Sequence, residues 1–197
     1  MRLSFFNLTL FKNKYLIESA RLKNWDYSSS AAYFLTICTK NMINFLSKIR
    51  NEKVFLTSIG NIVKEEWLQT EKIRDNIVLD EYAIMPNHVH GIILIFNDEN
   101  LSVETHSMRL KQTNLQISKG DAFDASLRVK SKDNISNIIR GFKSRSTSRI
   151  LRSGHLDFAW QPRFYDHIIR TEKGLDNIRD YILMNPAKWN RDEYYKD

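Results

Sequence analysis

Two histidines separated by one residue, His88 and His90, are the part of this sequence with the clearest chemical potential. They open an apolar run over residues 88–96 that is typical of a β-strand. Side chains alternate between the faces of a strand, so both imidazoles share one face while Val89 points into the core. Two imidazoles on one rigid strand can bind a single metal ion. The spacing therefore predicts a metal site, with a hydrogen-bonded pair that holds no metal as the alternative.

Two tyrosines are placed where they can join such a site. Tyr181 lies in a helical stretch four residues before Asn185, so the phenol and the amide share a helix face and can approach one ion. Ordinary packing of Tyr181 and helix capping by Asn185 are the alternatives. Tyr165 and His167 share one face if residues 159–170 are extended, and they can then border the same site.

Residues 140–152 form a basic run in which serine and threonine lie between the cations and no acid compensates them. Such a run favours contact with phosphate groups over a merely solvated helix face. Two further cations flank Tyr165. The predicted DNA-binding residues of these segments are Arg140, Lys143, Arg145, Arg149, Arg163 and Arg170.

The elements that must position these residues follow from periodicity and turn signals. We expect strands at 33–39, 78–85, 88–96 and 159–170, with Pro86 and Asn87 joining the second and third as a hairpin. Helices are expected at 58–74, 135–152 and 172–185, the last capped by Thr171 and ended by Pro186. This order predicts a ferredoxin-like α+β fold, an antiparallel sheet with helices on one face plus a C-terminal helix. Residues 97–133 are polar and predict a mobile surface insertion within a single domain.

Composition narrows the class of protein. The chain has 197 residues, 42% of them hydrophobic, and a formal net charge of +7 with a pI of about 9.4. This balance indicates a folded domain with a polyanionic partner, nucleic acid before an anionic membrane surface. No apolar run is long enough to cross a bilayer. The single cysteine, Cys38, lies in a strand-like run and is expected to be a core residue of a cytoplasmic protein rather than a nucleophile.

The segment Met85-Pro-Asn-His-Val-His90 resembles the HUH signature of insertion-sequence single-tyrosine transposases. The resemblance is closest to their REP-associated tyrosine transposase branch and runs from about residue 17 to 190. Further matching segments are residues 21–27, 33–39, 141–144, 160–170 and 180–186.

This resemblance implies a function. Such enzymes cut single-stranded DNA at hairpin-associated sites by tyrosine attack, leave a 5′-phosphotyrosine and a free 3′-hydroxyl, and join strands by the reverse step. It assigns the nucleophile to Tyr181, which precedes the Asn-Pro that ends the helix. It gives His88, His90 and Asn185 to a divalent metal, Mg²⁺ or Mn²⁺, and implies that Arg21 and Trp25 help to recognise the DNA.

Other functions remain to be weighed. A transposase-derived module that binds single-stranded nucleic acid without cutting it would use the same basic and aromatic residues. A replication or mobilisation relaxase shares the histidine pair but is usually larger. A histidine-triad hydrolase needs a third histidine at position 92, where this chain has Ile92. Relatives include monomers and dimers, so both oligomeric states are open.

Overall fold

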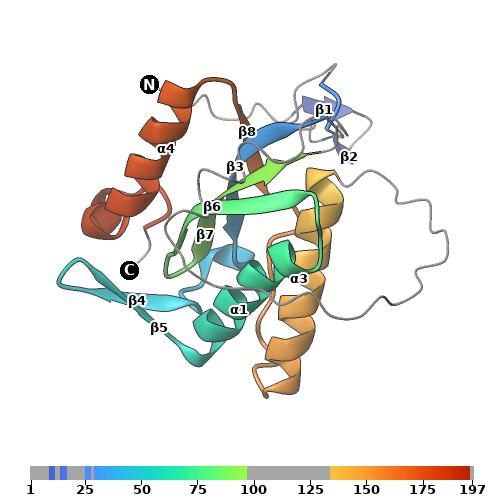
Figure 1. Ribbon diagram of the computed structural model, residues 1–197. Helices are drawn as coiled ribbons and strands as arrows, with labels where there is room; N and C mark the ends of the chain where they lie inside the picture. Colours follow the sequence, from blue (N-terminus) through green and yellow to red (C-terminus); the bar gives the residue numbers. More distant parts are fainter. Residues whose placement is uncertain (1–8, 12–13, 17–24, 28, 97–133, 196–197) are drawn as a thin grey trace, which may run out of the picture.

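The computed structural model describes residues 9–11, 14–16, 25–27, 29–96 and 134–195 (Figure 1). The predicted insertion at 97–133 and Arg21 lie outside the described residues. A four-stranded antiparallel sheet in the order β6-β7-β3-β8 forms the centre of the molecule. Its strands are β3 (Ala31–Cys38), β6 (Ile77–Ile84), β7 (His88–Ile95) and β8 (Tyr165–Ile169). With a helix after β3 and another before β8, this order confirms the ferredoxin-like α+β fold.

Helices α1 (Ser58–Lys72) and α3 (Ile135–Arg152) cover one face of the sheet (Figure 1). Each begins at a side-chain cap: the Thr57 hydroxyl accepts from the Gly60 amide, and the Asn134 side chain accepts from the Asn137 amide. Their apolar stripes meet alternate side chains of the strands in the main core. Its largest fully buried members include Trp67, Tyr33 and Phe142.

Helix α4 (Glu172–Met184) packs on the opposite face of the sheet. The Thr171 hydroxyl caps it by accepting from the Gly174 amide, as predicted. Ile182 meets Ile92 and Ile169 in a second, smaller apolar cluster. The helix ends before Pro186, where the chain continues as the 3-10 helix η4 (Pro186–Arg191), since proline is tolerated in a first helical turn.

The β6–β7 hairpin has the predicted two-residue turn. Ile84 pairs with Val89, and the Met85 amide donates to the His88 carbonyl at 2.8 Å, which leaves Pro86 and Asn87 at the turn. A β-bulge between Leu79 and Tyr82 shifts the register further along β6. The hairpin turn therefore lies at the same end of the sheet as His88.

Two features differ from the sequence expectations. The strand expected at 159–170 is wrong in its first half: only residues 165–169 form β8, and Trp160 makes an isolated bridge to Thr39. Pro162 has no amide hydrogen to donate to a ladder there. A hairpin of β4 (Ser47–Arg50) and β5 (Lys53–Leu56) was not predicted, because its turn carries Asn51 and Glu52 at positive φ without a glycine.

The remaining described elements are small. A two-stranded sheet joins β1 (Thr9–Phe11) to β2 (Lys14–Leu16), and η1 (Lys40–Met42) follows β3. Cys38 is buried at the end of β3, and desolvation raises the pKa of its thiol to about 12, which fits the expected core role. Within the described ranges, none of the helices has the length and apolar character that crossing a membrane requires.

Candidate functional site

The histidine pair lies on β7, where His90 contacts Tyr181 of α4 and His88 contacts the segment after α4. Val89 between them is fully buried in the main core on the other face, so the predicted alternation is confirmed. The two imidazole rings are 4.4 Å apart between centroids and are almost completely buried, at 0% and 1% exposure. They are therefore close enough to act as one unit.

Neighbouring polar side chains fix the orientation of each imidazole. The Nδ1 atom of His88 lies 2.8 Å from the Asn87 Oδ1 atom, an oxygen that can only accept, so Nδ1 carries the proton. The Nδ1 atom of His90 lies 3.0 Å from the Thr36 hydroxyl on β3. In a neutral imidazole with a protonated Nδ1, the Nε2 atom keeps a free lone pair. His88 can thus present Nε2 as a ligand, and His90 can do so in the tautomer in which the Thr36 hydroxyl accepts from Nδ1. This is the arrangement found when a partner group orients a metal-binding histidine.

Burial keeps both histidines neutral. Desolvation lowers the pKa of His90 to about 3. It also lowers the pKa of His88 well below its ordinary value, and the nearby His90 adds to the effect. A neutral imidazole is the form that binds a metal ion.

Tyr181 reaches the histidine pair from α4. Its hydroxyl lies 3.3 Å from the Nε2 atom of His90, and its ring packs edge-on to Phe34. The side chain is 43% exposed, so the phenol is open to solvent on one side. Burial of the other side raises its pKa to about 12, with Asp192 and Glu193 adding to the rise and a hydrogen bond to Asn185 opposing it. At neutral pH the phenol keeps its proton unless a cation comes close.

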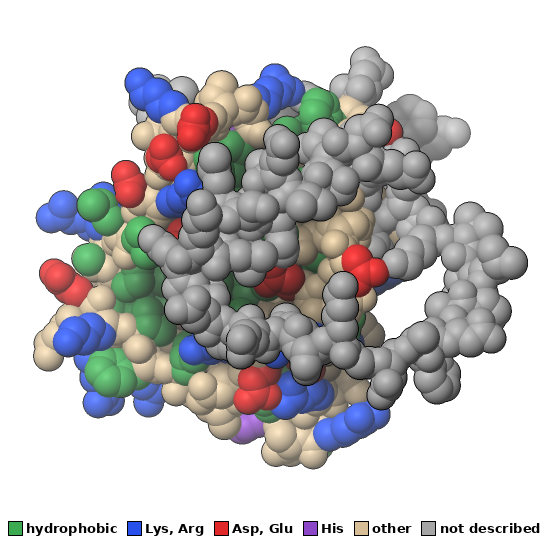
Figure 2. All heavy atoms as spheres, viewed as in Figure 1, with side chains coloured by type: hydrophobic (Ala, Val, Ile, Leu, Met, Phe, Trp, Pro, Cys, Tyr) green, Lys and Arg blue, Asp and Glu red, His purple; other side chains and the backbone are tan. Residues whose placement is uncertain are grey.

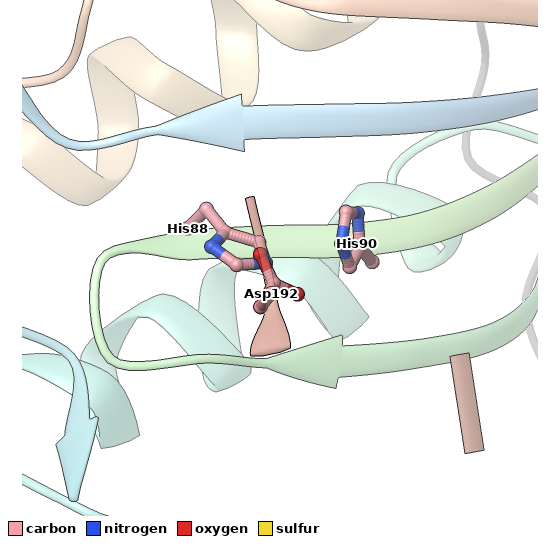
Figure 3. Close-up of side chains that lie close together, drawn as sticks. All are labelled: His88, His90 and Asp192. Atoms are coloured by element: carbon pink, nitrogen blue, oxygen red, sulfur yellow. The ribbon is translucent and has the colours of Figure 1, made fainter. Parts of the chain in front are cut away.

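A third metal-binding group comes from the segment after η4. The carboxylate of Asp192 and the ring nitrogens of His88 and His90 all lie within 4.8 Å of one another (Figure 3). Sequence reasoning missed Asp192, because nothing in a short tail after a proline indicates that it folds back onto a sheet. Asn185 was the sequence candidate for this role and remains a prediction.

Two buried acceptor atoms mark the same site. Among the described residues, the Nε2 atom of His88 and the Oδ1 atom of Asn185 have no hydrogen-bond partner although both are buried. Leaving such atoms unpaired costs about 1–3 kcal/mol each. Two neutral imidazoles, a carboxylate and an amide oxygen form a donor set that suits a divalent cation such as Mn²⁺. The residues present therefore fit a metal.

Aromatic side chains from the tail cover the histidines. The ring of Tyr194 lies 4.7 Å from that of His88, and the ring of Trp189 lies 6.0 Å from it. The tail is tied down because the Asn87 side-chain amide donates to the Tyr194 carbonyl at 2.7 Å and to the Met42 carbonyl at 3.2 Å. Asn87 thus orients His88 and anchors the tail at the same time.

An ion pair joins α4 to the sheet in addition to the apolar contacts of the helix. Arg179 donates to both oxygens of Asp80 on β6, at 3.1 and 2.6 Å, and the Asp80 side chain is only 3% exposed. The bulge in β6 lies at this carboxylate. A two-point contact of this kind fixes the register of a helix better than apolar packing alone. It holds α4 where Tyr181 meets His90.

The other two sequence candidates on this face are placed less centrally. Tyr165 packs against Phe34 at 6.4 Å between centroids, but its hydroxyl has no hydrogen bond to the histidine pair among the described contacts. His167 is exposed on β8 opposite Phe34 and is not part of the metal-binding group of the described residues. The predicted place of His167 at the border of the site therefore stays a prediction.

The basic run of α3 lies on the face of the sheet opposite the histidines. Arg145 and Arg149 form ion pairs with Glu66 of α1, and Arg149 also pairs with Glu65. Sequence reasoning found no acid near them because these glutamates lie about 80 residues earlier in the chain. These two arginines are thus partly neutralised, and the DNA contact predicted for them is weakened.

The remaining predicted DNA-binding residues lie on α3 and in the segments around β8 and before β3. Arg140 donates to Asn137, and the Lys143 ammonium donates to the carbonyls of Gln161 and Arg163 at 2.7 and 2.8 Å. The guanidinium of Arg170 lies 5.9 Å from the Trp25 ring, and Trp25 in turn donates to the Tyr33 hydroxyl near the start of β3. His88 pairs with the last residue of β3. The amino-terminal match therefore lies at the end of the sheet away from His88.

Known proteins resemble this chain over most of its length. It is 35% identical over 184 residues to an uncharacterised protein of Haemophilus influenzae, with 91% of this chain and 93% of the relative covered. It is 26% identical over 175 residues to a protein of the same organism assigned as a REP-associated tyrosine transposase, with 87% and 79% covered. No protein-family model matches the chain.

A solved structure of a REP-associated tyrosine transposase bound to a REP hairpin has a similar fold. Its TM-score is 0.50 at 19% sequence identity, with 85% of this chain and 73% of that chain covered. At this identity the likeness concerns the fold, which agrees with the sheet order and the helices described above.

Proposed function

We propose that this chain is a metal-dependent DNA-nicking and DNA-joining enzyme of the REP-associated tyrosine transposase kind, with Tyr181 as its nucleophile, in line with the similarity to such a protein over 87% of the chain. The observation that carries this proposal is the Tyr181 hydroxyl 3.3 Å from the Nε2 atom of His90, at a group of residues fit to bind a divalent cation. A nucleophile and an electrophilic centre for phosphate are the two parts that the reaction needs.

His88, His90 and Asp192 would hold the cation, with the Asn185 amide oxygen as a further candidate ligand. The cation, when bound, supplies positive charge that polarises the scissile phosphate and lowers the pKa of a nearby phenol. Asn87 holds His88 with Nε2 available, and Thr36 would do the same for His90 by accepting from its Nδ1. The half-exposed position of Tyr181 leaves space for a DNA strand to approach it.

In the proposed cleavage step the Tyr181 oxygen attacks phosphorus and a new P–O bond forms. The bond from phosphorus to the 3′ oxygen of the preceding nucleotide breaks, leaving a free 3′-hydroxyl and a 5′-phosphotyrosine. The phenol proton passes to solvent, which the exposed side of the ring allows, and the leaving 3′ oxygen takes a proton from solvent. Joining is the reverse step, in which a 3′-hydroxyl attacks the phosphotyrosine and releases the tyrosine.

The proposed substrate is single-stranded DNA next to a hairpin, in line with the hairpin-bound relative. The site can be formed within one chain, since Arg179 and Asp80 seat α4 on its own sheet. This arrangement favours activity as a monomer. A non-cleaving, DNA-binding regulator is the second candidate, favoured by the aromatic rings of Trp189 and Tyr194 over the histidine pair.

Covalent trapping distinguishes the two candidates. The purified protein is incubated with Mn²⁺ and labelled hairpin oligonucleotides from the DNA that flanks its own gene, beside Tyr181→Phe and Tyr165→Phe. We expect a protein–DNA adduct on denaturing gels that is lost in Tyr181→Phe and kept in Tyr165→Phe. Loss only in Tyr165→Phe would move the nucleophile to β8. Tight DNA binding without an adduct at any metal concentration would favour the regulator.

A further inference from the structure

The β4–β5 hairpin is a basic and aromatic ribbon that the proposed mechanism does not use. Its strands pair Lys48 with Phe55 and Arg50 with Lys53. Directly opposed residues of an antiparallel pair share one face, so these four side chains form a single surface. All four are exposed, and the Phe55 ring is 54% exposed. We call this surface the ribbon face.

The side of the ribbon opposite the ribbon face packs against the rest of the protein. Ile49 and Val54 are half-buried there, and Leu56 packs against the main core. The Ser47 hydroxyl donates to the Ile84 carbonyl at 3.0 Å, which fixes the ribbon to β6. The ribbon is therefore packed against the rest of the protein on this side, and Phe55 is exposed because it lies on the opposite side.

The ribbon starts beside the proposed active site. The Leu46 amide donates at 2.8 Å to the carbonyl of Pro86, in the turn that leads into His88. Strand β5 also contacts η4, the segment that precedes Asp192. Figure 1 shows the hairpin extending away from the sheet near the C-terminal end of the described chain, and Figure 2 shows basic side chains around hydrophobic ones in that region.

The charges on the ribbon face are suited to an anion. Lys48, Arg50 and Lys53 form no ion pair with another described residue, unlike Arg145 and Arg149 of α3. The one acid of the ribbon, Glu52, is at its tip. The two cross-strand pairs of the ribbon face are two residues apart, which is about 7 Å along the strand.

We propose that the ribbon face binds the single-stranded DNA that flanks the cleavage position, with its three cations at backbone phosphates and Phe55 stacked on a base. This proposal rests on the proposed function and names a part of its substrate-binding surface. An exposed aromatic side chain among cations is the combination that binds unpaired strands, because every base offers a flat face and every nucleotide a phosphate. A base-paired stem offers no free base for Phe55.

DNA binding without cleavage tests the proposal. Fluorescence anisotropy compares a stem–loop oligonucleotide that carries short single-stranded arms with the same stem–loop without arms, both in EDTA. The test variant is Arg50→Gln/Lys53→Gln. The matched control is Lys64→Gln/Lys72→Gln, which removes two exposed lysines from α1, outside the ribbon face.

We expect the ribbon variant to bind the armed oligonucleotide about tenfold more weakly than the control does, and the bare stem–loop within twofold of it. The slope of log K against log salt falls by about 1.4 for the armed oligonucleotide, from about 0.7 for each phosphate contact. Phe55→Leu lowers affinity for the arms about fivefold, whereas Phe55→Trp retains it, because tryptophan keeps a stacking surface.

Equal affinities of the ribbon and control variants would overturn the proposal, as would an equal loss on the bare stem–loop. The outcome is independent of catalysis. If the wild type forms no covalent adduct while the ribbon variant loses binding to the arms, the ribbon assignment stands and the proposed nicking activity falls.

Discussion

Replacing Asn87 by alanine tests the hydrogen-bond network around the histidines most directly. Asn87 is fully buried, and its side chain makes three hydrogen bonds: from His88 Nδ1 at 2.8 Å, to the Met42 carbonyl at 3.2 Å and to the Tyr194 carbonyl at 2.7 Å. Asn87→Ala leaves the buried N–H of His88 without its acceptor and removes the amide donor from two part-buried carbonyls. At about 1 kcal/mol for each bond we expect a loss of about 3 kcal/mol in the free energy of unfolding.

The same change removes the group that holds His88 with its Nε2 atom free. Loss of such an orienting partner weakens metal binding about 10- to 100-fold. For a chain of this size, a loss of about 3 kcal/mol lowers the melting temperature by about 6–12 °C. Urea unfolding followed by tryptophan fluorescence measures the first quantity, and titration with Mn²⁺ followed by electron paramagnetic resonance measures the metal affinity.

Asn87→Asp is the matched control, because it keeps an acceptor for His88 but loses both donors to the carbonyls. We expect it to lose stability while keeping most of the metal affinity. If Asn87→Ala binds Mn²⁺ within twofold of the wild type, Asn87 does not orient His88. If its free energy of unfolding is also within about 0.5 kcal/mol of the wild-type value, the three hydrogen bonds make no net contribution to stability, in contrast to the usual contribution of such bonds.

Three further changes test other contacts. Gly91→Ala places a Cβ atom 2.3 Å from the buried tryptophan ring of α1 and should lower stability by about 3 kcal/mol in urea, so an unchanged midpoint would mean that α1 can shift. Arg179→Gln should slow adduct formation at saturating DNA about tenfold by loosening α4, whereas Asp176→Asn, which breaks only an exposed ion pair, should leave the rate within twofold. Acidification should destabilise the protein, since the folded-state pKa values of His88 and His90 lie below 6.5 and the unfolded chain takes up protons first as the pH falls from 6.5 toward 3. At pH 5.5 the free energy of unfolding falls by about 1.4 kcal/mol for each histidine. If these two histidines are the cause, the urea midpoints of the wild type and of His88→Gln/His90→Gln should converge as the pH falls.

Much of the fold could be read from local patterns. The turn at Pro86 and Asn87, the cap at Thr171 and the helices around 58–72 and 135–152 appear where the sequence places them. These signals depend on residues close together in the chain, so they can be recognised without knowledge of the tertiary structure. The β4–β5 hairpin was not predicted because its turn has no glycine. Residues 159–164 were wrongly predicted as a strand because aromatic residues occur in loops as well as in strands.

The sequence by itself determined that His88 and His90 share one face of a strand and that Tyr181 lies one helical turn before Asn185, because strand alternation and helix period are local geometry. Only the tertiary structure decided what meets them. Asp192 comes to the histidines through the fold of the tail, and Arg179 reaches Asp80 across 99 residues of chain. Such contacts depend on how whole elements pack, and a local pattern carries no distance between elements far apart in the chain.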